Sequence, residues 1–183
     1  MRNLATCFQE SARELKEHKT LVVTAMMIAL GVVLGFYTVQ IGDFLKIGFS
    51  GLANELTAML FGPVIGGLMG GVTDILKFVI RPTGPFFFGF TLNAVLGAVI
   101  YGMFWYKRPL SLKRVFAAKI TVAIVVNLFL NTYWLSILYG KGFAALLPAR
   151  AIKQLISVPV DSLLFFLVAG MLVRAKVFGK LKA

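Results

Sequence analysis

LFGPVIGGLMGGVTDILKFVIRPTGPFFFGF, residues 60–90, joins a long apolar run to a small group of charges. Asp74, Lys77 and Arg81 come at the end of that run, three and four residues apart, so one face of a helix would carry all of them. A charged side chain at membrane depth is costly, and such residues are usually kept for a function. We therefore predict a membrane helix here, with part of a functional site on its charged face.

The rest of the chain is as apolar as this stretch. Of its 183 residues, 59% are hydrophobic and only 14% are charged, and the mean hydropathy is +0.88, unlike a soluble domain. Because a spanning helix needs about 20 residues, the sequence predicts an all-α integral membrane protein, a compact bundle of six transmembrane helices. The predicted spans are residues 20–37, 51–60, 63–80, 86–106, 115–138 and 149–173. The second is short, which indicates a tilted, broken or partly buried helix.

The distribution of charge predicts the orientation of this bundle. Six spans place both termini on one side of the membrane, and basic residues favour the cytoplasmic side. With cytoplasmic termini, thirteen of the nineteen Lys and Arg residues lie inside: Arg2, Arg13, Lys16, Lys19, Lys107, Arg108, Lys113, Arg114, Lys119, Arg174, Lys176, Lys180 and Lys182. The net charge of +12 then reflects topology and contact with anionic lipid, without any need for nucleic acid. The predicted parts are a cytoplasmic amphipathic leader (1–19), which we expect to be retained, a membrane domain (20–175) and a basic cytoplasmic tail (176–183).

Polar side chains recur at helical spacing on three of the spans. They are Asp74, Lys77 and Arg81 on the third, Asn127, Asn131 and Trp134 on the fifth, and Arg150, Lys153, Gln154, Ser157 and Asp161 on the sixth. Residues at this spacing share one helix face, and Asn93 on the fourth span lies at a similar depth. We therefore predict a pocket in the outer half of the bundle, with a carboxylate and amides at its floor. Six cations, Lys46, Lys77, Arg81, Lys141, Arg150 and Lys153, would lie outside or near its mouth.

Each of these residues also has a simpler interpretation. Asn side chains commonly join membrane helices by hydrogen bonds. Lys77 and Arg81 can extend to the lipid headgroups, and Asp74 can pair with Lys77. The phenylalanines around residue 88 are typical of an interfacial aromatic belt, although Phe88 and Trp134 are also candidates to stack on a flat ligand. The coincidence of the stripes at one depth favours the pocket.

The sequence lacks the motifs of several enzyme classes. It contains no G-x-x-x-x-G-K-[ST], so we expect that the chain does not itself bind ATP phosphates in the P-loop manner, and no H-E-x-x-H, C-x-x-C or G-x-S-x-G is present. The single cysteine, Cys7, and the single histidine, His18, are interpreted as incidental surface residues. An intramembrane lipid-modifying enzyme that uses Asp74 or Asp161 remains an alternative, although the sequence supplies no nucleophile beside them.

Two adjoining segments carry a resemblance to a known family. LFGPVIGGLMGGVTDILKF and RPTGPFFFGFTLNAVLGAVIYG resemble the substrate-binding S components of energy-coupling factor (ECF) vitamin transporters, most closely the folate-specific ones, over residues 20–175. The resemblance implies that the chain captures a vitamin from outside, without a cofactor of its own. A separate module of one membrane subunit and two ATPases would power uptake. Ala25 and Ala29 match the family's A-x-x-x-A motif, which contacts the membrane subunit.

If folate is the ligand, the helical spacing of the polar residues suggests a role for each of them. Folate joins a planar pterin to a glutamate tail with two carboxylates, and buried polar groups need partners. Asp74, Asn93 and Asn131 would hydrogen-bond the pterin, and the cations Lys77, Arg81, Lys141, Arg150 and Lys153 would attract the tail, with Gln154 in the same stripe. The loops at residues 40–47 and 140–148 are the expected gates. Another vitamin on the same architecture remains an alternative, and Glu55 has no predicted role beyond pairing within the bundle.

Overall fold

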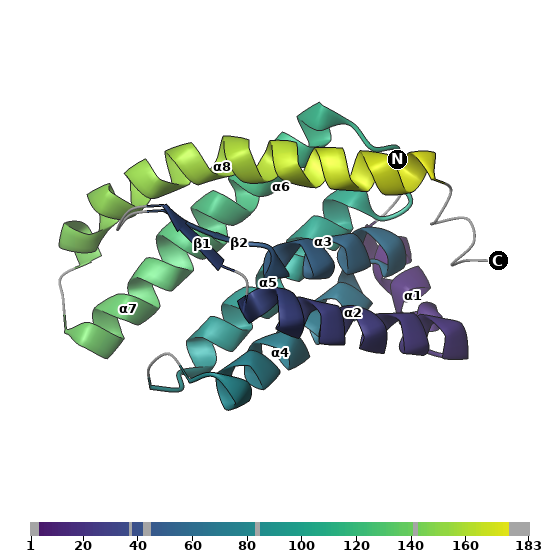
Figure 1. Ribbon diagram of the computed structural model, residues 1–183, viewed down its shortest axis with the longest axis horizontal. Coiled ribbons are helices and arrows are strands. Elements are labelled where there is room, and N and C mark those ends of the chain that lie inside the picture. The colour runs from purple at the N-terminus through teal and green to yellow at the C-terminus, as the bar shows by residue number, and fades with distance from the viewer. Residues whose placement is uncertain (1–3, 37, 42–44, 83–84, 141–142, 176–183) are drawn as a thin grey trace.

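The computed structural model describes residues 4–36, 38–41, 45–82, 85–140 and 143–175. Its helices run mostly along the long axis of the molecule, with a small hairpin near one end (Figure 1). In chain order the elements are α1 (Leu4–Glu14), α2 (His18–Phe36), β1 (Thr38–Ile41), β2 (Leu45–Gly48), α3 (Ser50–Phe61), α4 (Pro63–Ile80), α5 (Phe88–Trp105), α6 (Leu112–Val122), the π-helix η1 (Ala123–Leu130), α7 (Asn131–Tyr139) and α8 (Phe143–Arg174).

Five helical stretches of the described chain are long and apolar enough to cross a membrane. They are His18–Phe36, Pro63–Ile80, Phe88–Trp105, Leu112–Leu138, which joins α6, η1 and α7, and Leu147–Arg174. The prediction of a helical integral membrane protein is confirmed, and the span predicted at residues 63–80 coincides with α4. The predicted span at residues 51–60 corresponds to α3, which has only 12 residues, eight of them buried. Most of this helix is packed inside the protein, which agrees with the partly buried helix among the three alternatives that its short apolar run left open.

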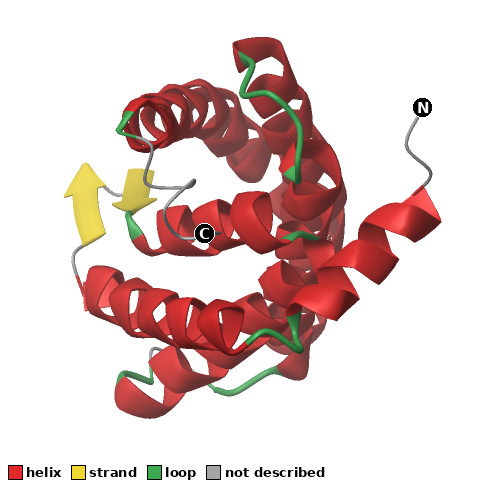
Figure 2. Cartoon of the chain, turned by 90° about the vertical axis from the view of Figure 1, so that its right-hand side faces the viewer, coloured by secondary structure: helices red, strands yellow, loops and turns green. Residues whose placement is uncertain are grey.

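The segment between α2 and α3 differs from the expected loop. Strands β1 and β2 pair antiparallel, with Thr38 opposite Gly48 and Ile41 opposite Leu45, and β2 contacts α8. The hairpin lies at the opposite end of the bundle from α1 (Figure 1) and on the opposite side (Figure 2). Pairing the strands satisfies backbone groups that an open loop would leave to solvent.

Glycines allow α3, α4 and α5 to approach closely. A Cβ added at Gly70 of α4 would lie 2.8 Å from the carbonyl oxygen of Ala94 in α5. At Gly102 of α5, a Cβ would lie 2.5 Å from the backbone of Pro63, the first residue of α4. Glycines of α4 and α5 thus serve internal packing between these helices.

The charged leader contains a helix that docks onto the turn between α3 and α4. Ser11 of α1 is fully buried; its hydroxyl donates to the Phe61 carbonyl (2.7 Å) and accepts from the Val64 N–H (3.1 Å). A side chain from α1 therefore satisfies a backbone group in the first turn of α4, where N–H groups lack helical partners. Cys7 lies on the same helix and is buried, so its interpretation as a surface residue was wrong.

Tyr106, just after α5, ties the end of α1 to the bundle. Its hydroxyl donates to Glu14 Oε1 at 3.1 Å. Burial, and then the Glu14 carboxylate beside it, raise the pKa of Tyr106 above its ordinary value. The hydroxyl therefore stays protonated and able to donate at any physiological pH.

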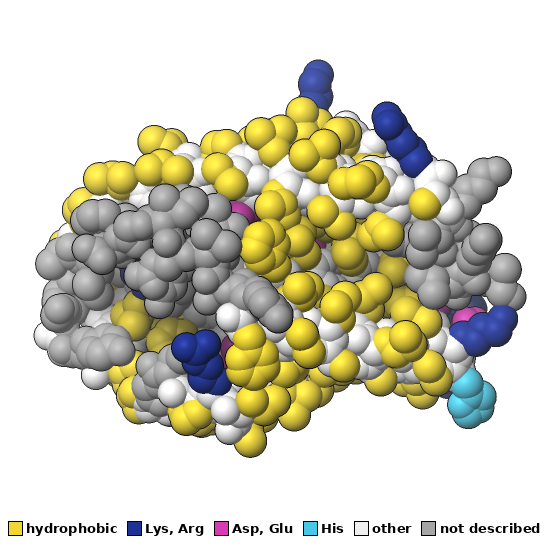
Figure 3. All heavy atoms as spheres, viewed as in Figure 1, with side chains coloured by type: hydrophobic (Ala, Val, Ile, Leu, Met, Phe, Trp, Pro, Cys, Tyr) yellow, Lys and Arg dark blue, Asp and Glu magenta, His cyan; other side chains and the backbone are white. Residues whose placement is uncertain are grey.

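The outer surface is mainly apolar. Hydrophobic side chains cover much of the described part of the face in Figure 3. On α8, Leu155, Leu167 and Met171 are each more than 60% exposed, which suits a helix surrounded by lipid.

The close approach at Gly102 generates a prediction about stability. In a helix interior, alanine is favoured over glycine by about 1 kcal/mol, but at Gly102 the new methyl group would collide with the backbone of Pro63. We expect Gly102→Ala to lower the Tm of the purified protein in detergent. Gly170→Ala in α8 is the matched control, since a Cβ there meets no described atom within 4 Å, and it should leave the Tm equal or higher. Equal effects of the two changes would contradict the packing of α5 on this turn.

Candidate ligand-binding cavity

A cavity of about 270 Å³ lies between α3, α5 and the junction of α6 with η1. This volume is near the lower end for small-molecule sites, so it suits a ring system rather than a whole drug-sized ligand. Three helices from separate parts of the chain build its walls. The lining residues are Gly51, Asn54, Glu55, Asn93, Ala94, Gly97, Ala98, Tyr101, Val122, Val126 and Asn127.

Asn93 links this cavity to Trp134. It is buried (8% exposed), and its Oδ1 accepts a hydrogen bond of 3.2 Å from the indole Nε1 of Trp134 in α7. Because an indole N–H can only donate, the oxygen of the Asn93 amide must face Trp134. The NH₂ group of the amide is then left free to bond elsewhere. That nitrogen has no hydrogen-bond partner among the described residues. Gly89 provides room for the indole, since a Cβ there would lie 2.7 Å from Trp134 Cδ2.

The opposite wall is an irregular helix. Residues 123–130 form a π-helix in the middle of the fifth predicted span, and such insertions are frequent at functional sites. Asn127 from this segment lines the cavity, and its carbonyl oxygen accepts a hydrogen bond of 3.4 Å from Arg150 Nη1 of α8. Arg150 therefore lies against the outside of the cavity wall. The next predicted amide, Asn131, has a buried Oδ1 without a partner in the described part of the chain.

Asp74 and Lys77 do not line this cavity, and each bonds to a neighbouring helix. Asp74 is half-buried and accepts a hydrogen bond of 2.8 Å from Thr91 of α5, two residues before Asn93. Lys77 runs beside Gly35 of α2 and donates to the Ser50 hydroxyl at the start of α3. The two residues therefore join α4 to three other helices, in addition to any contact with a ligand.

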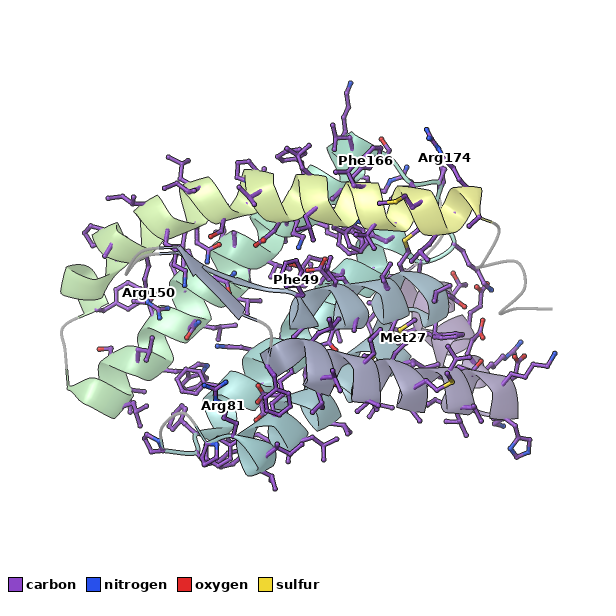
Figure 4. The ribbon with its side chains drawn as sticks, in the orientation of Figure 1. Met27, Phe49, Arg81, Arg150, Phe166 and Arg174 are labelled. Atoms are coloured by element: carbon purple, nitrogen blue, oxygen red, sulfur yellow. The ribbon has the colours of Figure 1, made fainter. Side chains whose placement is uncertain are left out.

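The other predicted residues occupy varied positions. Arg81 is exposed at the end of α4, and Figure 4 shows it at the same end of the bundle as Arg150 and opposite Arg174. Phe88 is 68% exposed, whereas Phe87 lies with its ring centroid 5.6 Å from that of Trp134. Lys153 and Gln154 are half-buried on α8. Lys141 lies outside the described residues.

Glu55 and Lys119 form a buried ion pair that the sequence analysis missed. Lys119 Nζ lies 2.5 Å from Glu55 Oε1, and both side chains are only 8% exposed. The Lys119 ammonium also lies 5.3 Å from the ring centroid of Tyr101, close enough for a cation–π contact. Lys119 was counted among the cytoplasmic cations that contact anionic lipid, but it is buried inside the bundle, where it neutralises a carboxylate instead. Charge counting along the sequence could not reveal the pair, since its members are 64 residues apart.

Unpartnered polar atoms gather around the cavity. Among the described residues, the buried side-chain atoms without hydrogen bonds include Asn54 Oδ1, Glu55 Oε2 and Asn93 Nδ2, all from lining residues. A buried polar group without a partner is costly and needs an explanation, such as a water or ligand. The arrangement is that of a small site with both hydrogen-bond acceptors and a donor.

Comparison with known proteins decides the family. The model of the family described as "ECF transporter, substrate-specific component" matches residues 19–169, most of the chain. The chain belongs to this family. A protein named folate transporter FolT from Clostridium novyi (strain NT) is 36% identical over 167 residues, 91% of this chain and 96% of the relative. Another folate transporter FolT, from Leuconostoc mesenteroides subsp. mesenteroides, is 33% identical over 146 residues, 76% of this chain and 78% of the relative.

A solved structure agrees with this membership. The structure titled "Crystal structure of FolT bound with folic acid" matches with a TM-score of 0.71 and 35% identity, covering 81% of this chain and 90% of the other. This S component is therefore a multi-pass membrane transport protein, and membership excludes the lipid-modifying enzyme as an alternative. Ala25 and Ala29, which match the family motif, are both exposed on α2.

The buried ion pair generates a prediction about stability. Lys119→Met would leave the Glu55 carboxylate buried without its cation, a change that typically costs about 3 to 5 kcal/mol. The double variant Lys119→Met, Glu55→Leu removes both charges and should recover most of that loss. Chemical unfolding of each purified variant in the same detergent would measure the difference. A double variant that is no more stable than Lys119→Met would contradict the coupling of the two residues.

Proposed function

We propose that this S component captures folate from the outside and delivers it inward with a separate ATP-driven module. The observation that carries the proposal is its similarity to two proteins named folate transporter FolT and to a FolT structure bound with folic acid. The cavity supports it, because a space of about 270 Å³ with several unpartnered polar atoms suits a flat, polar ring. Another vitamin in the same cavity is the alternative.

The pterin ring is placed in the cavity between α3 and α5. Asn93 offers its NH₂ group there, and Trp134 is held at the back of that amide. Asn131 lies at the junction of η1 and α7 with an unpartnered oxygen. Asp74 lies outside the cavity lining and accepts a hydrogen bond from Thr91, so it is proposed only as a partner at the edge of the ring, beyond Asn93.

The glutamate tail is placed against cations at the end of the bundle that contains the hairpin. Arg150 is the best supported, since it is half-buried and bonds to the cavity wall at Asn127. Lys153 and Gln154 lie within one turn of it on α8, and Arg81 lies at the same end (Figure 4). Guanidinium groups suit carboxylates because they form paired, charge-assisted hydrogen bonds. Lys77 and Lys141 complete the proposed set of cations, and Phe88 is an aromatic contact at the mouth.

We also propose six spans with cytoplasmic termini, α3 being the short second span. Supporting this topology, α1 and the last turn of α8 lie at the same end of the bundle (Figure 1), opposite Arg81 and Arg150 (Figure 4). The domain proposal is unchanged: a leader at 1–19, a membrane domain at 20–175 and a basic tail at 176–183. The leader's helix α1 nevertheless packs on the membrane domain through Ser11.

The proposed partners are one membrane-embedded coupling subunit and two ATPase subunits. Membership of the family supports this module, which would bind the ATP. Ala25 and Ala29 are the proposed contact, and their exposure on α2 leaves a surface where another helix can approach closely.

Binding of folate to the purified full chain in detergent tests the function. The chain has two tryptophans: Trp134 at the cavity and Trp105, which stacks on Phe165 in the core (centroids 4.2 Å apart). We expect saturable quenching by folate that persists in Trp105→Phe and largely disappears in Trp134→Phe. Riboflavin and thiamin are the control ligands. The same titration of free N-acetyltryptophanamide with folate measures the loss of fluorescence that is caused only by the absorption of light by folate. Tight binding of a control vitamin without folate binding would refute the substrate assignment.

The tail assignment makes a separate prediction. Arg150→Ala should weaken folate binding about tenfold or more through the loss of a charge-assisted bond. It should leave the binding of 6-hydroxymethylpterin, which has no glutamate tail, nearly unchanged. Arg174→Ala, an exposed arginine at the other end of the bundle, is the matched control and should affect neither ligand. An equal loss of both ligands in Arg150→Ala would show that this arginine supports the cavity wall rather than the tail.

A further inference from the structure

Glu55 stands out because neither the proposed function nor helix packing accounts for both of its oxygens. It lines the cavity from α3 and is nine-tenths buried. One oxygen, Oε1, lies 2.5 Å from Lys119 Nζ, whereas Oε2 is buried with no hydrogen bond to any described residue. A carboxylate retained only for packing would be expected to use both oxygens, because unsatisfied buried acceptors are costly.

Lys119 holds this carboxylate in place. It reaches Glu55 from α6, and its ammonium lies 5.3 and 5.9 Å from the ring centroids of Tyr101 and Phe165. The ammonium is therefore in contact with one carboxylate oxygen and two aromatic rings, which favour its position beside Glu55. The carboxylate is thus paired with a cation in a buried place, and its second oxygen, which has no partner among the described residues, remains available as an acceptor.

The cavity wall formed by α5 supplies the complementary group. Asn93 is also nine-tenths buried, and its bond from Trp134 leaves the NH₂ group as a donor without a partner in the described chain. One cavity therefore has a charged acceptor on α3 and a neutral donor on α5. This pair matches a heterocycle edge that carries N–H donors and a carbonyl or ring-nitrogen acceptor. A metal ion is a poorer match, since Lys119 already neutralises Glu55 and the described residues hold no group of three metal ligands.

We propose that Glu55 is a specificity-determining residue that accepts hydrogen bonds from the 2-amino and ring N–H groups of a pterin, and that Lys119 is its positioning residue. This inference rests on the proposed function and assigns the ring's orientation within it. The amino-pyrimidine edge faces α3, and the ring's acceptor faces Asn93. Asp74 is a weaker candidate for this role, because it lies outside the cavity lining and one of its oxygens accepts from Thr91.

A coupled change of ligand and residue tests the assignment. The ligands are folate and an analogue with a methyl group in place of the 2-amino group, titrated against the purified full chain in detergent. For the unaltered protein, we expect the analogue to bind about ten- to a hundredfold more weakly, because the methyl group leaves Glu55 Oε2 unpaired. In Glu55→Gln the analogue should bind at most about threefold more weakly than folate, since the amide that replaces the carboxylate does not need hydrogen bonds from both the 2-amino and the ring N–H groups. In Asp74→Asn, the matched carboxylate-to-amide change, the full penalty should persist.

The outcomes separate the inference from the function on which it rests. Failure of folate to bind the unaltered protein would overturn the proposed function and this inference together. If folate and the analogue bind the unaltered protein equally well, only the assignment of Glu55 is overturned. This comparison does not depend on the folding of any variant. If the analogue loses as much affinity in Glu55→Gln as in the unaltered protein, the assignment of Glu55 is also overturned. If that loss disappears only in Asp74→Asn, the role belongs to Asp74.

Discussion

Inside the hydrocarbon of a membrane, a polar group can bond only with the protein around it. Polar side chains of this S component meet that constraint by pairing across helices. Thr91 of α5 donates to Asp74 of α4, and Lys119 of α6 pairs with Glu55 of α3. Since each partner comes from a different helix, the bonds that satisfy these groups also fix which helices are neighbours. The polar residues therefore determine the packing as much as the apolar ones do.

Some of the exceptions to this pairing lie around the cavity that we propose as the ligand site. Asn93, Glu55 and Asn54 each leave a buried polar atom without a partner in the described structure, and all three line the same cavity. A buried polar group without a partner is costly, so a ligand or water in this cavity would complete all three atoms. The cavity offers both acceptors and a donor, which suits a molecule with hydrogen-bonding groups on more than one edge.

The walls of the cavity differ in regularity. One wall is formed by α5, which approaches α4 on its other contacts until only glycine fits, as at Gly70 and Gly102, so the two backbones are in contact and leave little freedom to shift. On the other side, η1 interrupts a long span with a π-helix, and its Asn127 carbonyl bonds to Arg150 instead of serving the helix alone. The cavity is therefore bounded by a tightly packed helix on one side and by an irregular helix on another.

The sequence by itself determined the parts of this protein that depend on local pattern. The apolar runs predicted the membrane helices, and the span at residues 63–80 coincides with α4, because hydropathy and the F-G-P turn act over neighbouring residues. The resemblance around residues 60–102 likewise indicated the family. Tertiary structure alone decided the partnerships between distant residues: Glu55 with Lys119, Asn93 with Trp134, and Ser11 with the turn before α4. Helical spacing assigns a residue to a face, but which oxygen or nitrogen it finds there depends on how helices far apart in sequence pack against one another.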